Sequence, residues 1–322
     1  MAEIRQAGSS AIPRLGGVQK INDRLSGSLP LLAIAVTVIL WASAFVAIRH
    51  VGKEISAGGL ALGRLLVAAA VLGLVILLRR RPAAAGADGS TLTAWPRGRA
   101  WWNLLTVGVV WFGLYNIALN EGERHVDAGT AAMIVNVGPI LIAVLAGAFL
   151  GEGFPRKLII GSLVAFGGVV LIGVSSSSGT GTSLWGAALC LFAAIAYAVG
   201  VVTQKPLLGQ MQALRVTWLA CLIGAAVCLP FAGDLVNDLR TASLPALGWV
   251  VYLGVMPTAV GFLTWAYALA RSTAGRLGAS TYLVPPLAVL MGWALLGETP
   301  AALAIAGGAV CLVGVAIARR RS

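Results

Sequence analysis

The sequence predicts an all-α integral membrane protein, and its composition, the length of its apolar segments and an internal repeat all support this fold class. Of its 322 residues, 59% are hydrophobic and 11% are charged, and the mean hydropathy is +0.91. A soluble domain of ordinary surface-to-volume ratio cannot bury that much apolar surface. The apolar segments are about 20 residues long, as a helix that crosses roughly 30 Å of hydrocarbon must be. Spanning β-strands would instead alternate over about ten residues.

We expect ten transmembrane helices joined by short connections. The longest connection, residues 79–100, is rich in Ala, Gly and Arg and is predicted to be a solvated linker. Residues 1–29 are polar, lack the apolar core of a cleavable signal peptide and are predicted to form a disordered tail. The expected helices are residues 30–48, 57–78, 101–120, 127–149, 157–174, 183–203, 214–232, 246–268, 275–296 and 301–318.

The basic residues predict the orientation of these helices. If the N-terminus is cytoplasmic, the inner segments carry 18 of the 23 Lys and Arg residues and the outer loops carry four. Under the positive-inside rule, both ends, including the basic C-terminus at residues 319–322, face the cytoplasm across the inner (plasma) membrane. The net charge of +12 is thereby explained by topology, and no nucleic-acid partner is needed. Membrane lipids and a small-molecule substrate are the expected partners of a monomer or homodimer.

One apolar segment occurs twice in the chain. Residues 136–152 (NVGPILIAVLAGAFLGE) and residues 282–298 (YLVPPLAVLMGWALLGE) are 146 residues apart, and their prolines and their Leu-Gly-Glu ends fall in register. The same offset aligns Gly161 with Gly307. Upstream, residues 115–119 resemble residues 265–269 at an offset of 150, which implies four extra residues after the third helix.

Two halves of five helices therefore make up the chain, at residues 30–174 and 183–318. Because five is odd, the second half must start on the opposite side of the membrane from the first, so the repeats are inverted. Inverted repeats are typical of secondary transporters, in which two related halves expose one central site alternately to either side. The alternative is a duplication that serves only helix packing.

The sequence resembles the EamA type of the drug/metabolite transporter superfamily. The resemblance rests on Trp41-Ala-Ser-Ala-Phe45, Gly63-Arg64, Ala128-Gly-Thr-Ala-Ala132 leading to Pro139, and the two Leu-Gly-Glu ends. It implies a ten-helix exporter or importer of small organic metabolites such as amino acids, and it implies no particular substrate. We expect alternating access from the inverted repeat, and export is the direction that we prefer.

Prolines near the middle of two helices are candidate hinges. Pro139, Pro285 and Pro286 lack a backbone donor and should kink the fourth and ninth helices at membrane depth. A kink there either permits a hinge motion or only serves packing.

Polar and aromatic groups at membrane depth are the candidate substrate-binding residues, because such groups are costly to expose to lipid. They would suit an amphipathic solute, with its apolar part packed on rings and its polar end hydrogen-bonded. Their alternative roles are interfacial belts for aromatic residues and helix–helix hydrogen bonds for the amides. The candidates are Trp41, Ser43, Phe45, Arg64, Tyr115, Asn116, Asn136, Tyr197, Trp265 and Tyr282.

Arg64 is the one charged residue predicted to lie well inside a span. A guanidinium there costs about 2.5 to 3.5 kcal/mol on insertion scales, so it must face a polar partner or water. Two roles remain open for it. It could hold a substrate carboxylate, or it could bind carbonyls freed by the kinks at Pro139 or Pro285.

The remaining chemistry of the chain favours a carrier without a cofactor or metal. All 11 acidic residues fall in tails, loops or helix ends, and Glu152 and Glu298 come nearest to a proton-coupling position, although a terminal acid usually is solvated or pairs with Arg156 or a helix N-terminus. There is no nucleotide-binding GxxxxGK[ST] motif, no metal-ligand spacing and no clustered catalytic group, so neither an ATP-driven pump nor an enzyme is expected. A membrane receptor or scaffold remains the alternative, but it would not require an inverted repeat.

Overall fold

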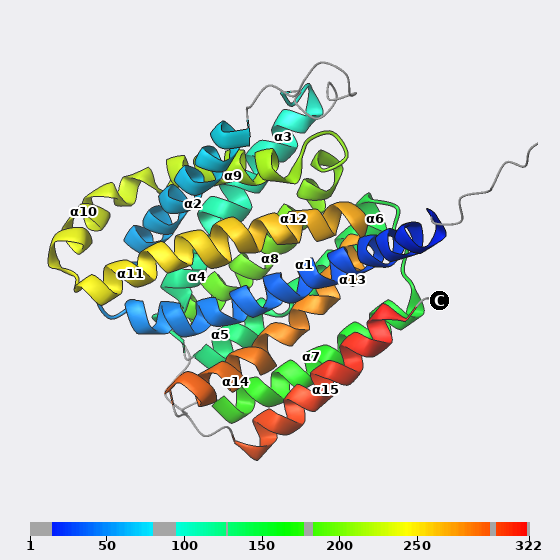
Figure 1. The fold of residues 1–322 in the computed structure, drawn as a ribbon. Helices are drawn as coiled ribbons and strands as arrows, with labels where there is room; N and C mark the ends of the chain where they lie inside the picture. Colours follow the sequence, from blue (N-terminus) through cyan, green and yellow to red (C-terminus); the bar gives the residue numbers. More distant parts are fainter. Residues whose placement is uncertain (1–14, 80–94, 127, 177–182, 297–300, 321–322) are drawn as a thin grey trace, which may run out of the picture.

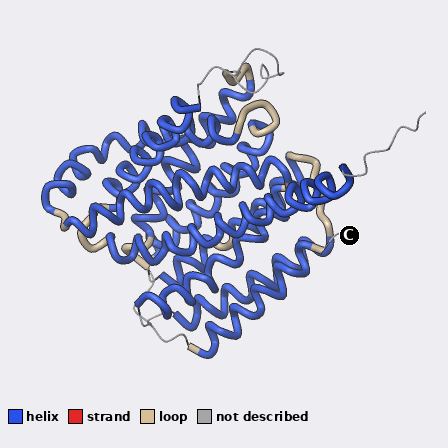
Figure 2. Tube along the Cα trace, viewed as in Figure 1, coloured by secondary structure: helices blue, strands red, loops and turns tan. Residues whose placement is uncertain are grey.

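The computed structural model describes residues 15–79, 95–126, 128–176, 183–296 and 301–320 as a bundle of helices (Figure 1). Throughout these ranges the regular structure is helical (Figure 2). Nine helical segments of the described chain are long and apolar enough to cross a membrane. They are Ser28–Ile48, Ala57–Arg79, Arg99–Gly122, Arg156–Ser175, Leu184–Leu207, Ala213–Thr241, Leu244–Arg271, Ala274–Leu295 and Ala302–Arg319.

The segment expected as the fourth helix is not one continuous helix. It consists of α5 (Ala128–Val135) and α6 (Gly138–Phe149), with Pro139 in the first turn of α6. The ninth expected helix is interrupted in the same way, because a short 3₁₀ turn, η4 (Thr281–Leu283), separates α13 (Ala274–Ser280) from α14 (Val284–Leu296). Proline removes a donor and disfavours the α conformation of the residue before it. Both interruptions therefore fall just before the prolines that the sequence predicted to kink these helices.

Two further helices contain a π-helical segment. In the third, η1 (Val107–Leu114) lies between α3 (Arg99–Thr106) and α4 (Tyr115–Gly122). In the eighth, η3 (Gly254–Val260) lies between α11 (Leu244–Leu253) and α12 (Gly261–Arg271). A π segment widens the helix and changes which carbonyls find a backbone donor, and such segments are frequent at functional sites.

The remaining helices are continuous or nearly so. They are α1 (Leu15–Val51), α2 (Ala57–Arg79), α7 (Arg156–Ser176), α8 (Leu184–Leu207), α9 (Ala213–Cys228) with η2 (Leu229–Phe231) and α10 (Ala232–Thr241), and α15 (Ala302–Arg319). Two boundaries differ from expectation by more than four residues. Residues 15–29, predicted to be disordered, begin α1, and the seventh helix continues through α10 to Thr241. A helix can extend beyond its apolar span because its backbone hydrogen bonds need no apolar surface. Glu298 and residues 80–94 of the expected linker lie outside the described residues.

Helix starts recur at a constant spacing in the two halves. The offset of 146 residues therefore holds from the third helix onward, and the four extra residues expected after the third helix are not present. The sequence similarity that suggested them aligned residues 115–119 with residues 265–269, which lie one helical turn out of register. The paired starts are Tyr115 and Gly261, Ala128 and Ala274, Gly138 and Val284, and Arg156 and Ala302.

Helices α7 and α15 lie side by side at one edge of the bundle (Figure 1). Glycines allow their backbones to approach closely. A Cβ on Gly168 would lie 2.5 Å from the carbonyl oxygen of Gly307, and a Cβ on Gly161 would meet the backbone of Gly314 and Ala318. Because the earlier glycine of one helix meets the later glycine of the other, the two helices run antiparallel. Small residues permit such packing between helices in a membrane.

Candidate functional site

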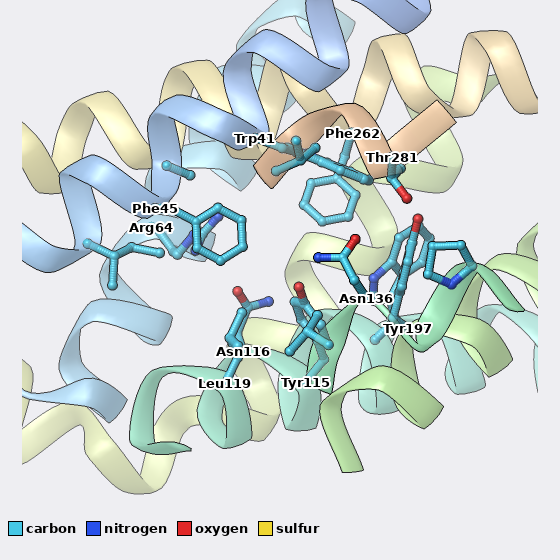
Figure 3. Close-up of a pocket in the computed structure, with 16 residues that line it drawn as sticks. Trp41, Phe45, Arg64, Tyr115, Asn116, Leu119, Asn136, Tyr197, Phe262 and Thr281 are labelled. Atoms are coloured by element: carbon cyan, nitrogen blue, oxygen red, sulfur yellow. The ribbon is translucent and has the colours of Figure 1, made fainter. Parts of the chain in front are cut away.

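A cavity of about 720 Å³, including its open mouth, lies among the helices and receives side chains from both halves of the chain (Figure 3). Most of its lining is aromatic or aliphatic. The lining residues are Trp41, Ala44, Phe45, Ile48, Arg64, Trp111, Tyr115, Asn116, Leu119, Val135, Asn136, Pro139, Tyr197, Phe262, Thr281 and Val284.

A cluster of aromatic rings closes one side of this cavity. Trp41 stacks on Trp265 with ring centroids 5.0 Å apart, and Phe262 lies 5.3 Å from Trp41 and 5.2 Å from Trp111. Tyr197 packs against the same group, 5.5 Å from Trp111. Aromatic pairs at such distances add roughly 0.5 to 1.5 kcal/mol each beyond the burial of their area. Four of these rings, those of Trp41, Trp111, Tyr197 and Phe262, line the cavity.

Arg64 is the one charged side chain among the lining residues of the described chain. It comes from α2 and is only 6% exposed. Its Nε donates a hydrogen bond to Oγ1 of Thr258 at 2.9 Å, and Thr258 in turn donates to the carbonyl of Leu253 at 2.7 Å. The sequence analysis named backbone carbonyls freed by the kinks at Pro139 or Pro285 as possible partners of this guanidinium. Its recorded partner lies instead in the π segment η3.

The amides of the cavity are positioned by the irregular stretches of two helices. Asn116 donates from Nδ2 to the carbonyl of Phe112 at 2.8 Å, within η1. Asn136 lies at the interruption between α5 and α6 and is 7% exposed. In Figure 3, Asn116 lies on the same side of the cavity as Arg64, whereas Asn136 lies nearer to Tyr197 and Thr281.

Two hydroxyl groups face each other on that second side. The Tyr197 hydroxyl points toward Thr281 (Figure 3) without a hydrogen bond of standard geometry. Thr281 donates to the carbonyl of Gly278 at 2.7 Å. The indole Nε1 of Trp41 is also buried and has no hydrogen-bond partner among the residues that the structure describes. Buried donors in this state cost free energy until a ligand or water accepts from them.

The structure brings seven of the ten candidate binding residues to the cavity and places three elsewhere. Ser43 bonds to the Tyr252 hydroxyl at 2.7 Å on another face of α1. Trp265 lies behind Trp41 and is 1% exposed, and Tyr282 is buried in a separate core with α7 and α15. The depth of a residue in a span can be read from sequence, but these three side chains point away from the cavity. The seven at the cavity are Trp41, Phe45, Arg64, Tyr115, Asn116, Asn136 and Tyr197.

The sequence reasoning missed Trp111, Phe262 and Thr281. Trp111 and Phe262 lie near the middle of the third and eighth helices, so the depth criterion used for Trp41 would have found them. Thr281 immediately precedes the candidate Tyr282 in the sequence. The 3₁₀ turn η4 turns the threonine, and not the tyrosine, toward the cavity.

Away from the cavity, two charged groups hold the corner between α12 and α13. Lys205 donates from Nζ to the carbonyls of Leu269 at 2.6 Å and Ser272 at 2.7 Å. The Glu152 carboxylate accepts from the backbone N–H groups of Ala274 at 2.6 Å and Gly275 at 3.0 Å. A cation at a helix C-terminus and an anion at a helix N-terminus are both favourable. Glu152 therefore pairs with a helix N-terminus, one of the alternatives to a proton-coupling role.

Apolar helices long enough to span a bilayer, arranged around a mostly apolar internal cavity, define a multi-pass membrane protein. The model of the EamA-like transporter family matches the chain twice, at residues 28–174 and 184–320. The chain belongs to the EamA-like transporter family. Proteins of this family and the relatives below are named for transport and not for catalysis.

Relatives in other organisms carry transporter names over nearly the whole chain. A protein of Streptantibioticus cattleyicolor named "Probable terminal-alkyne amino-acid exporter" is 37% identical over 291 residues, covering 90% of this chain and 93% of the relative. The "Uncharacterized transporter YdfC" of Bacillus subtilis is 31% identical and covers 86% of each chain. A solved structure, described as "Crystal structure of protein", shares the fold with a TM-score of 0.71, 20% identity, and coverage of 91% of this chain and 96% of the other.

Proposed function

We propose that this protein is a secondary transporter whose substrate site is the aromatic cavity, and that it exports small organic solutes with a carboxylate and an apolar part. Amino acids with apolar side chains fit this description. The observation that carries the proposal is Arg64, a cation at the wall of a cavity that is otherwise mostly apolar. A guanidinium binds a carboxylate through two parallel hydrogen bonds, and aromatic faces pack the rest of the solute.

The polar groups of the cavity suit such a solute at more than one point. Asn116 lies on the Arg64 side and would assist in holding the carboxylate (Figure 3). Asn136, Tyr197 and Thr281 lie on the other side, where an amino group could donate to their oxygens and rest on the ring faces. We therefore assign substrate contact to the seven predicted residues at the cavity, and add Trp111, Phe262 and Thr281.

We further propose that the chain folds as two inverted repeats of five helices, residues 30–174 and 183–318, with α5 and α6 together forming one crossing. Support comes from the family model, which matches each half separately. The constant offset between helix starts agrees with it. So does the contact between α7 and α15, where equivalent positions of the two halves meet in an antiparallel pair. Such a relation allows the two halves to exchange conformations, which is the basis of alternating access.

The orientation that we propose has both termini in the cytoplasm and the protein in the plasma membrane, as the distribution of Lys and Arg indicates. In that orientation the lining residues Ala44, Ile48 and Leu119 lie toward the outer ends of their helices. The corner held by Lys205 and Glu152 lies at the inner end. The state described would thus be open outward and closed inward. The name of the relative from Streptantibioticus cattleyicolor favours export as the direction of net transport.

Passage between states requires hinges, and we assign these to Pro139, Pro285 and Pro286. Each helix concerned already lacks regular α structure just before its proline. A short irregular stretch can absorb a change in backbone angles with little loss of hydrogen bonding. Because Asn136 and Thr281 lie in these stretches and line the cavity, a hinge motion there would also change the substrate contacts.

Counterflow in proteoliposomes tests the proposal directly. Vesicles loaded with unlabelled leucine are diluted into labelled leucine, and leucinamide, which lacks the carboxylate, serves as the matched competitor. Propargylglycine, a terminal-alkyne amino acid, and phenylalanine extend the panel. We expect saturable counterflow that the free acids inhibit and leucinamide does not. A receptor or scaffold would give no counterflow with any member of the panel, and that result would overturn the transporter assignment.

A further inference from the structure

Arg64 shares its guanidinium between a partner in the second half of the chain and the cavity. Its Nε is occupied by the hydrogen bond to Thr258. Within the described chain this is the one hydrogen bond recorded for the guanidinium, while Arg64 also lines the cavity. The two terminal Nη groups are therefore the part of the side chain available to a solute.

Two hydrogen bonds, one to a backbone carbonyl at the start of the π segment and one from Arg64, fix the orientation of the Thr258 hydroxyl. In an α-helix the carbonyl of Leu253 would accept from the N–H of residue 257, but that residue is proline and has no N–H. The Thr258 hydroxyl donates its single hydrogen to this carbonyl at 2.7 Å. Its oxygen lone pair is then left to accept from Arg64 at 2.9 Å. Donor and acceptor roles are both assigned, so the hydroxyl cannot rotate without losing a buried hydrogen bond.

The backbone of Arg64 is held by the same segment. Gly254 opens η3, and a Cβ at that position would lie 3.0 Å from the Arg64 carbonyl oxygen and 2.5 Å from the Cβ of Val67. The absence of a side chain at Gly254 thus permits α2 and η3 to touch. The backbone of Arg64 and its Nε therefore both contact the short stretch from Leu253 to Thr258.

We propose that Thr258 is a positioning residue that sets the substrate preference of the cavity, by aiming the two Nη groups of Arg64 end-on at a carboxylate. This inference rests on the proposed function. With Nε occupied, the guanidinium presents one edge with two parallel donors. That edge matches the two acceptor oxygens of a carboxylate. It matches a carboxamide poorly, because the NH₂ group of the amide is a donor and would face the N–H donors of the guanidinium. Without Thr258 the side chain gains rotational freedom and offers its other edge as well, so the selection weakens.

The test measures equilibrium binding of two probes, leucine and leucinamide, to purified protein in lipid nanodiscs. Thr258→Val removes the hydroxyl and keeps the shape. We expect it to weaken leucine binding by about tenfold, because the guanidinium is then no longer held in place and has to be ordered when leucine binds, while leucinamide binding stays within about twofold. Thr258→Ser, which keeps the hydroxyl, should restore the preference for leucine. A general structural defect would weaken both probes alike.

Thr217→Val is the matched control. Thr217 is 0% exposed in α9, and its hydroxyl has no hydrogen-bond partner in the described chain, so the same substitution there removes no such bond. If Thr258→Val proves unstable, Thr258→Cys replaces it, and its weaker donor should give a smaller loss of the same sign.

The outcomes separate this inference from the proposed function. An unchanged preference for leucine in Thr258→Val, or an equal loss of both probes, would overturn the positioning role of Thr258. If either outcome is seen but Arg64→Gln abolishes the preference for leucine over leucinamide, the proposed carboxylate site stands without a positioning role for Thr258. If wild type itself shows no preference for leucine over leucinamide and Arg64→Gln changes nothing, the carboxylate site fails, and the positioning role fails with it.

Discussion

The thiol of Cys311 in α15 donates a hydrogen bond to the backbone carbonyl of Ala165 in α7, at an Sγ–O distance of 3.3 Å. The two residues are 146 positions apart, which is the offset between the helix starts of the two halves. Equivalent positions of the two halves thus touch at the centre of the α7–α15 contact. A contact between equivalent positions is what a pseudo-twofold axis through that point would produce.

The tightness of this contact gives the first prediction. Gly168→Ala would place a Cβ 2.5 Å from the carbonyl oxygen of Gly307, so α7 and α15 would have to separate. We expect a loss of about 1 to 3 kcal/mol in the free energy of unfolding, seen as a lower melting temperature in detergent. Gly167→Ala is the control, because a Cβ there meets nothing within 4 Å. Equal melting temperatures for the two variants would contradict close packing at Gly168.

The second prediction concerns the interruptions before the prolines. Pro139→Ala and Pro285→Ala restore a backbone donor and should let a straighter helix form without preventing insertion. We expect slower leucine exchange with nearly unchanged leucine affinity. Pro206→Ala is the control, since α8 runs through Pro206 as a continuous helix. If both hinge variants exchange leucine as fast as wild type, the prolines serve packing only.

The third prediction concerns the corner between α12 and α13. Glu152→Ala removes the acceptor for two backbone N–H groups, and Lys205→Met removes the donor to two carbonyls. Both should favour opening at that end of the bundle. In a background without the native cysteines, we expect Val135→Cys in the cavity to react faster with an impermeant maleimide from the cytoplasmic side. No change in reaction rate from either side would rule out a gating role for this corner.

The fourth prediction concerns orientation. Arg97 and Thr241 are both exposed, and the proposed topology puts Arg97 inside and Thr241 outside. In the cysteine-free background, Arg97→Cys should label only in inside-out vesicles, and Thr241→Cys only in right-side-out vesicles. Labelling of both from one side would contradict the inverted arrangement of the halves.

The fifth prediction concerns pH. Glu54, in the connection after α1, accepts a hydrogen bond from the backbone N–H of Ser243 at 2.8 Å, and this bond lowers the pKa of its carboxyl below the ordinary 4.5. A lowered pKa means that the bond stabilises the fold above pH 4.5 and that the stabilisation is lost as the pH falls through the lowered value. Because the group is exposed, the effect should be small. Melting temperatures of wild type and Glu54→Gln should therefore converge below pH 4.5 and differ above it, and a constant difference would contradict this reading.

The sequence by itself was sufficient to predict an all-helical protein with membrane-spanning helices. The apolar segments had to be helices of spanning length, because no other structure of that length satisfies its own backbone in lipid. The interruptions before Pro139 and Pro285 also followed from local chemistry, since proline lacks a donor wherever it occurs. Arg64 became a candidate by counting along the second expected helix, and its side chain lines the cavity.

The direction in which each side chain points was decided only by the tertiary structure. In a soluble helix, apolar periodicity marks the buried face, but a helix in lipid is apolar on both its lipid-facing and its core-facing sides. Trp41 and Trp265 therefore look alike in sequence, although one lines the cavity and the other lies behind it. The partner of Arg64 was likewise beyond sequence, because Thr258 lies 194 residues away and reaches Arg64 only when η3 packs against α2.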